Sequence, residues 1–253
     1  GVAVPPGMSA WRLDVRDGGG RRAEAAAALA AVAARLPRHR VTALRGHRLL
    51  ALGTGRPQIE ALAGLAVHVW PDGAVPEPKL CGDVVLVCGP GAAAGCGRLL
   101  GATVHVPDSA TGDVDTDLGA KVAAAGRALA QGRDVVVHVG ALDEAAHRGD
   151  RDAKRAALER VDAELVAPLT AASRRDGRAI AVTSDHSTSS ETGCHGAEPV
   201  PIVVGGPGVG RSGPARLTER AVAAEPILAS PWTAAQSRDR RSPSAPSQPE
   251  PVA

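Results

Sequence analysis

Valine-rich apolar runs, each bounded by polar or glycine residues, recur along the chain from residue 83 onward. Runs such as DVVLVC at 83–88 and DVVVHV at 134–139 are short and continuous, which is typical of buried strands. We expect strands at 83–88, 103–106, 134–139, 179–183 and 201–204. Helices are expected at 118–131, 152–173 and 217–224. This alternation favours a parallel sheet whose strands are connected by crossover helices.

Local signals refine the helices and exclude two nucleotide-binding motifs. Asp115 or Thr116 is expected to cap the helix at 118–131, and Pro168 to kink or split the helix at 152–173. The glycines at 89–97 are not followed by Gly-Lys-Ser/Thr, so they do not form a phosphate-binding P-loop. The glycine-rich stretch after the strand at 201–204 opens no helix and is interpreted as a loop.

The pattern is weaker in the N-terminal part of the chain. We expect a helix at 22–36 that Pro37 ends, a strand or strand pair at 40–52, a short helix at 58–65 and a strand at 67–70. Pro71-Asp72-Gly73 is a turn signal. The run WRLDVR at 11–16 is interpreted as too polar for a buried central strand.

Composition and charge exclude several classes of function. The 253-residue chain has a net charge of +2, which is too balanced to indicate nucleic acid or an anionic membrane as partner. It contains no Phe or Tyr and only three Trp, and this shortage of aromatic platforms argues further against single-stranded nucleic acid as a partner. No apolar run approaches the ~20 residues of a membrane span. The Ser-, Pro- and Arg-rich tail at 230–253 is expected to be disordered.

The cysteines indicate a reducing compartment. None of the four forms a C-x-x-C pair, and a chain of this size does not need disulfides to fold, so we interpret them as reduced thiols of a cytoplasmic protein. They are Cys81, Cys88, Cys96 and Cys194.

Acidic and imidazole side chains follow two of the expected strands. Asp143 and His147 follow the strand at 134–139, and their four-residue spacing places them on one face of a helical turn. Asp185 and His186 directly follow the next strand, where adjacent side chains diverge and would serve different ions. His195 lies in the next loop and could close the first site. Mixed carboxylate and imidazole ligation suits Mn²⁺ or Zn²⁺ better than Ca²⁺.

The alternative interpretation is that these histidines are ordinary surface or core residues. Three of the eight histidines fall beside two aspartates in loops after strands, which favours a metal site.

Four segments closely resemble the C-terminal part of archaeal-type cofactor-independent phosphoglycerate mutases of the alkaline phosphatase superfamily. They read DEAAHRGD from 143, KRAALERVDAELVAPL from 154, VTSDHST from 182 and HGAEPVPIVV from 195. Weaker similarity is carried by GHRLL at 46–50, VWPDG at 69–73 and SATGDVDTDLGAK at 109–121.

The resemblance implies an α/β fold with an alkaline-phosphatase-like, mixed and mostly parallel sheet, flanking helices and the remnant of a smaller α+β lid domain. Residues 1–105 would be a partial substrate or lid domain and residues 106–229 the metal-binding phosphatase-like domain.

The resemblance also implies two divalent ions, with Mn²⁺ preferred and Zn²⁺ or Mg²⁺ as alternatives, and no need for 2,3-bisphosphoglycerate. Asp143, His147 and His195 would hold one ion and Asp185 and His186 the other. In the same way, Lys121 would contact the transferred phosphate, while Arg48 or Arg45 would bind substrate.

The family's nucleophile has no counterpart in the segments that carry the resemblance. The family uses an Asp-Gly turn and a serine that precede these segments, and Asp17-Gly18-Gly19 is only a superficial match. We therefore expect an incomplete mutase with little turnover as the chain stands.

The expected activity is that of a glycolytic isomerase, which interconverts 3-phosphoglycerate and 2-phosphoglycerate through a phosphoserine. The alternatives are another phosphomutase or phosphatase of the superfamily, or a non-catalytic metal-binding remnant.

Overall fold

The chain divides into two compact units. In the computed structural model, unit 1 comprises residues 1–165 and 188–196, and unit 2 comprises residues 166–187 and 197–253. The structure describes residues 4–62, 64–70, 80, 83–210, 213–214 and 216–225. The tail expected at 230–253 and the turn expected at 71–73 lie outside the described residues. The predicted boundary between residues 105 and 106 stays a prediction.

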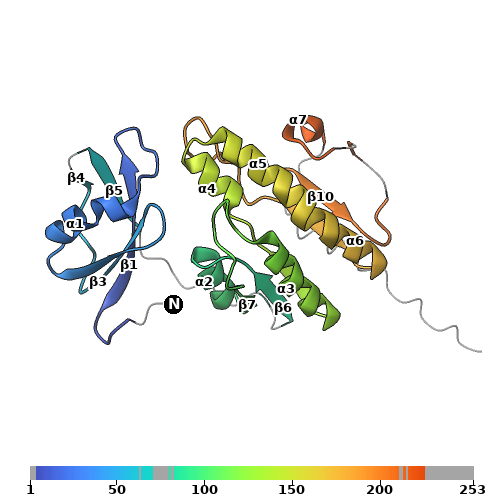
Figure 1. Ribbon diagram of the computed structural model, residues 1–253, viewed down its shortest axis with the longest axis horizontal. Helices are drawn as coiled ribbons and strands as arrows, with labels where there is room; N and C mark the ends of the chain where they lie inside the picture. Colours follow the sequence, from blue (N-terminus) through green and yellow to red (C-terminus); the bar gives the residue numbers. More distant parts are fainter. Residues whose placement is uncertain are drawn as a thin grey trace, which may run out of the picture. The chain divides into compact units, whose positions relative to one another are not determined.

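Unit 1 begins with an antiparallel five-stranded sheet (Figure 1). Its spatial order is β2-β3-β1-β5-β4, and helix α1, Ala25–Arg35, belongs with it. The strands are β1 Ser9–Asp17, β2 His39–Ala43, β3 Arg48–Gly53, β4 Ala61–Leu62 and β5 Leu65–Val69. Apolar residues of β1 are buried together with Ala28 and Val32 of α1 in one core cluster. The strand pair predicted at 40–52 and the helix predicted at 22–36 are confirmed.

The interpretation of WRLDVR as too polar for a central strand is wrong. β1 lies in the middle of the sheet, because Trp11, Leu13 and Val15 alternate with polar residues and fill the core. The buried carboxylate of Asp14 accepts hydrogen bonds from Arg12 Nε at 2.9 Å and from Trp70 Nε1 at 2.9 Å. A buried charge is tolerated in a strand when it is paired and hydrogen-bonded in this way.

The short helix predicted at 58–65 is also wrong. β4 instead pairs with β5, with Leu62 opposite Leu65. Gly64 lies in the tight turn between them with a φ of +77°, a conformation that glycine adopts readily. A helix as short as this one would be marginal in isolation, so the hairpin forms instead.

The second sheet of unit 1 is parallel, as the valine-rich runs predict. β6 Val84–Val87 pairs with β7 Thr103–His105 on one side and with β8 Asp134–Val137 on the other. Helices α2, Ala92–Leu99, and α3, Leu118–Ala130, form the connections (Figure 1). Ala124 and Ala128 of α3 pack on Val85 and Val87. The N-cap of α3 is Asp117, not Asp115 or Thr116, because the Asp117 side chain accepts from Ala120 N.

Two helices follow the parallel sheet within unit 1. They are α4 Ala141–His147 and α5 Arg151–Val161. A π-helical turn, η1 Asp162–Val166, then precedes α6 Ala167–Arg175. Pro168 lies in the first turn of α6, directly after this π-helical turn. The helix predicted at 152–173 is confirmed, with an interruption of its α-helical pattern just before Pro168, where a kink or split was expected.

In unit 2, β9 Ile180–Thr183 and β10 Ile202–Gly205 form an antiparallel pair, and α7 Glu219–Val222 follows. The expectation that β10 continues a parallel arrangement is therefore wrong, because no crossover helix connects the two strands. The expected class is confirmed: the structure is a mixed α/β fold with a parallel sheet and flanking helices. Within the described part of the chain, no helix has the length and apolar character of a membrane span.

Candidate metal centre

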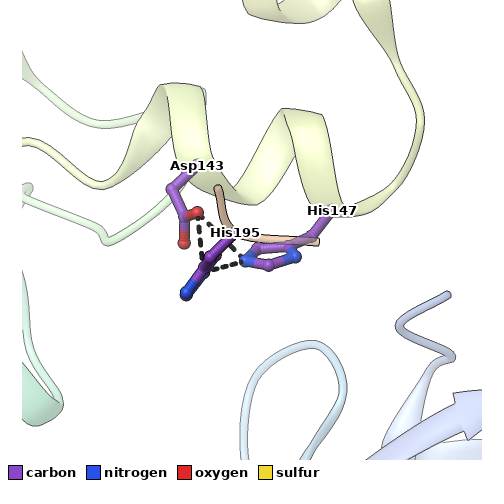
Figure 2. A group of neighbouring side chains, drawn as sticks. All are labelled: Asp143, His147 and His195. Carbon is purple, nitrogen blue, oxygen red and sulfur yellow. Dashed lines mark hydrogen bonds and ion pairs between the residues drawn. The ribbon is translucent and has the colours of Figure 1, made fainter. Parts of the chain in front are cut away.

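Helix α4 carries two of the predicted metal ligands. It begins after Gly140, just beyond the end of β8. Asp143 and His147 lie on the same face of this helix (Figure 2). The four-residue spacing brings Asp143 Oδ1 to 3.0 Å from His147 Nε2. The position of the helix just beyond the carboxyl end of a parallel strand is where α/β folds place their sites.

The loop at 188–196 supplies the third ligand. Thr188 and His195 form an antiparallel bridge that closes the loop. Gly193 within it has a φ of +67°, and a Cβ there would lie 3.1 Å from the carbonyl oxygen of His147. Only glycine combines this backbone conformation with such a close approach, so Gly193 fixes how the loop sits against α4.

The three ligand atoms form a compact triangle. His147 Nε2 lies 2.9 Å from His195 Nε2, and His195 Nε2 lies 3.4 Å from Asp143 Oδ1. Among the described residues, these three side chains form the group whose carboxylate and imidazole atoms lie close enough together to hold one metal ion. A tetrahedral ion with bonds of about 2.1 Å keeps its ligand atoms roughly 3.4 Å apart, so the triangle fits such an ion after a small expansion.

Hydrogen bonding decides which ring nitrogen of His147 can bind an ion in the triangle. Its Nδ1 lies 2.6 Å from the carbonyl oxygen of Gly193, which can only accept, so Nδ1 carries a proton and donates it. In the neutral ring, Nε2 therefore presents its lone pair to the carboxylate of Asp143. Two acceptors that face each other need a proton or a cation between them. A histidine that binds a metal through one ring nitrogen usually donates the N–H of the other to a carbonyl or carboxylate, as His147 does here.

Asp143 is held in its ionised form. Burial alone would raise its pKa, but three groups hold the pKa well below its usual range: the His147 ring when a proton on Nε2 takes the place of the ion, the Thr188 hydroxyl and the Arg22 guanidinium. The Thr188 hydroxyl donates to Oδ1 at 2.7 Å, and Arg22 Nη2 lies 3.8 Å from Oδ2. The carboxylate thus offers a negative charge to an ion at neutral pH.

The predicted ligands of a second ion belong to the other unit. Asp185 and His186 follow β9 in unit 2. Asp185 Oδ2 lies 3.4 Å from His186 Nε2, and the Asp185 side chain is 78% exposed. Their role as ligands stays a prediction.

The predicted phosphate contact, Lys121, is fully buried in α3. Its Nζ donates to the carbonyl oxygen of His138 at 2.8 Å, in the segment between β8 and α4. Burial lowers the pKa of this ammonium, because a charged group loses hydration there. In the described conformation Lys121 therefore supports the backbone that leads into the helix of Asp143 and His147.

The two predicted substrate arginines have acidic partners within unit 1. Arg45 Nη2 lies 2.6 Å from Asp115 Oδ2 at the surface. Arg48 forms an ion pair with Glu144, the residue after Asp143.

Reasoning from the sequence missed four residues around the triangle. Thr188 and Glu144 lie inside quoted motifs and Gly193 lies two positions before His195, so these positions were the available signal. Arg22 carried no comparable signal, because ion pairs between distant segments leave no periodic trace. The missed residues are Thr188, Gly193, Arg22 and Glu144.

Comparisons with known proteins connect this geometry to a family. The model of the Metalloenzyme superfamily matches residues 80–228, more than half of the chain, including the triangle. A 2,3-bisphosphoglycerate-independent phosphoglycerate mutase 1 of Archaeoglobus fulgidus is 42% identical over 110 residues, which are 44% of this chain and 26% of that protein. The corresponding mutase of Methanopyrus kandleri is 39% identical over 119 residues, 47% of this chain and 28% of that protein.

A solved structure supports the fold. The structure of PH0037 protein from Pyrococcus horikoshii superposes with a TM-score of 0.62, at 20% sequence identity, over 88% of this chain and 70% of that one. The chain aligns with little more than a quarter of the two curated mutases. The triangle and the family description together indicate a divalent metal ion as cofactor. From the extent of the family match, the chain belongs to the Metalloenzyme superfamily.

Proposed function

We propose that the chain provides the metal-binding part of a phosphoglycerate mutase that interconverts 3-phosphoglycerate and 2-phosphoglycerate through a phosphoserine. The archaeal relatives that bear this name support the proposal, at 42% and 39% identity over part of their length. The expected partner is a small phosphorylated metabolite, and 2,3-bisphosphoglycerate is not required. The cytoplasmic location expected from the sequence stays a prediction.

The observation that carries the proposal is the convergence of Asp143 Oδ1, His147 Nε2 and His195 Nε2. A divalent ion held there would neutralise charge on a phosphoryl group and favour the ionised form of an attacking hydroxyl. Asp143 contributes the negative charge of the site. Gly193 holds the ring of His147 in the tautomer whose Nε2 faces the triangle.

The remaining roles follow the family resemblance. Asp185 and His186 would hold a second ion, with Mn²⁺ preferred at both positions and Zn²⁺ or Mg²⁺ as alternatives. Lys121 would contact the transferred phosphoryl group. To do so, its ammonium has to give up its hydrogen bond to the His138 carbonyl and donate to a phosphoryl oxygen instead. Arg48 or Arg45 would bind the substrate anion, which would replace the present carboxylate partner of that arginine.

Metal content is the direct test of the triangle. The wild type, His147→Ala and the control His105→Ala are equilibrated with Mn²⁺ or Zn²⁺, desalted and measured by mass spectrometry. His105 is an exposed histidine on β7, so its replacement removes an imidazole away from the triangle. We expect ion retained by the wild type and the control and lost from His147→Ala. Equal retention in all three proteins would refute the assignment.

Turnover separates the mutase from its alternatives. The full-length gene product is incubated with 3-phosphoglycerate and Mn²⁺, and the products are followed by phosphorus NMR. Appearance of 2-phosphoglycerate that a chelator abolishes supports the mutase. Release of inorganic phosphate alone supports a phosphatase of the same superfamily. Retained metal with neither product supports a non-catalytic metal-binding role.

A further inference from the structure

A second charged cluster lies directly beside the triangle, and its centre is Glu144. This residue follows Asp143 in α4 and is 8% exposed. Its Oε2 lies 3.3 Å from Arg22 Nη1 and 4.0 Å from His47 Nδ1, while its Oε1 pairs with Arg48 Nη2. One carboxylate thus faces two guanidinium groups that come from the N-terminal part of the chain.

The hydrogen-bond donors of this cluster outnumber its acceptors. Arg22 is 11% exposed in its side chain, and its Nε and Nη1 are buried without a hydrogen-bond partner. The nearest carboxylate oxygens are Glu144 Oε2 and, at 3.8 Å, Asp143 Oδ2. Buried guanidinium donors without hydrogen bonds are costly, so the arrangement favours an additional acceptor.

The neighbouring groups do not supply that acceptor. His47 lies 3.6 Å from Asp14, whose carboxylate already accepts from Arg12 and Trp70. Oδ1 of Asp143 is committed to the triangle and to Thr188.

We propose that Arg22 and Arg48 form an oxyanion-binding site beside the metal centre, and that Glu144 occupies this site as an internal anion. A phosphoryl or carboxylate group of a ligand takes the place of Glu144 between the two guanidinium groups. The fork of an arginine matches such oxyanions with two parallel hydrogen bonds. A phosphoryl group offers three terminal oxygens, enough to accept hydrogen bonds from Nε and Nη1 of Arg22, which make none in this structure, as well as from Arg48.

The proposal rests on the proposed function for the identity of the ligand, and on the ion pairs alone for the existence of the site. Binding is therefore measured without turnover and without metal. The chelator-treated protein is titrated with inorganic phosphate by calorimetry, as wild type, Glu144→Gln, Arg22→Met and Glu159→Gln. The last variant removes one carboxylate from an exposed ion pair with Arg155 on α5 and serves as the charge-matched control.

We expect Glu144→Gln to bind phosphate about tenfold more tightly, because the competing anion is gone. Arg22→Met should bind about tenfold more weakly, and Glu159→Gln like the wild type. Arg22→Lys keeps the charge without the fork, so it provides a weakened but folded protein if Arg22→Met does not fold. Circular dichroism verifies the fold of each variant.

A parallel titration with glycerate, which has a carboxylate and no phosphate, identifies the anion. Tighter binding of phosphate in Glu144→Gln assigns the site to a phosphoryl group, and tighter binding of glycerate alone assigns it to a carboxylate. If Glu144→Gln binds both anions no better than the wild type, Glu144 only joins the segments and the proposal is overturned. A full-length gene product without mutase activity, together with a phosphate response of this chain, would refute the proposed function and keep the site.

Discussion

Replacing Gly193 by alanine tests whether the loop at 188–196 positions the metal ligands. The φ of +67° costs an alanine roughly 1–2 kcal/mol, since its Cβ crowds the backbone in the left-handed region. In addition, the new Cβ would lie 3.1 Å from the His147 carbonyl, so the loop has to move away from α4. That movement displaces both the carbonyl that orients His147 and the ligand His195.

The expected result is a loss of metal affinity larger than the loss of stability explains. Removing a group that orients a metal ligand typically weakens metal binding about 10–100-fold, which corresponds to roughly 1.4–2.8 kcal/mol. Zn²⁺ affinity is measured by competition with a chromophoric chelator, and the free energy of unfolding of the metal-free protein by urea denaturation.

Gly132→Ala is the matched control, because Gly132 also lies in unit 1, with a φ of +78°, but has open space where its Cβ would stand. Both variants should lose similar backbone stability, and only Gly193→Ala should lose metal affinity. Wild-type Zn²⁺ affinity in Gly193→Ala would refute the reasoning that the loop orients the ligands.

Three further predictions concern single side chains. Thr188→Val should weaken Zn²⁺ binding about tenfold in the chelator assay, because Asp143 loses a 2.7 Å hydrogen bond. Lys121→Met should gain stability over the wild type in urea at pH 7, and the gain should shrink as the pH rises toward about 10. The sign follows because burial lowers the pKa of Lys121, so the folded wild type sheds the costly charge before the unfolded chain does. Asp14→Asn should lose about 3 kcal/mol of unfolding free energy at pH 7, and less below about pH 4. Burial would raise the pKa of Asp14, but His47 and Arg12 hold it lower, so its stabilisation disappears as acid protonates it.

Each of these predictions has an outcome that contradicts it. Unchanged Zn²⁺ affinity in Thr188→Val would mean that the hydroxyl does not orient Asp143. A pH-independent difference between Lys121→Met and the wild type would show that no buried ammonium is involved. For Asp14→Asn, a loss of stability that stays constant down to pH 2 would exclude the ionised carboxylate as its cause.

The part of the site that follows local geometry could be predicted from the sequence. Asp143 and His147 lie one helical turn apart, so their convergence needed only the periodicity of a helix. The parallel strands were equally visible, because buried strands are continuous apolar runs. His195 was suggested by its motif, and the antiparallel bridge with Thr188 explains how it reaches the helix.

The features that the sequence did not predict depend on contacts between distant residues. β1 was misjudged because the carboxylate of Asp14 pairs with Arg12 and accepts a hydrogen bond from Trp70, which is 56 positions away. Glu144 and Arg48 are 96 positions apart, and no local pattern encodes such a pair. The antiparallel pairing of β9 and β10 was hidden because a single strand has the same pattern in either direction.

The loop at 188–196 belongs to unit 1, although the chain on both sides of it belongs to unit 2. His195 therefore reaches His147 across a sequence separation of 48 residues. During synthesis, the ligand set stays incomplete until the chain has been made beyond β9. A bound ion would then link the two ends of the long segment between His147 and His195. It would stabilise only those chains in which the loop at 188–196 already contacts α4. Metal uptake by nascent chains of increasing length would consequently show the chain length at which the loop at 188–196 first reaches α4.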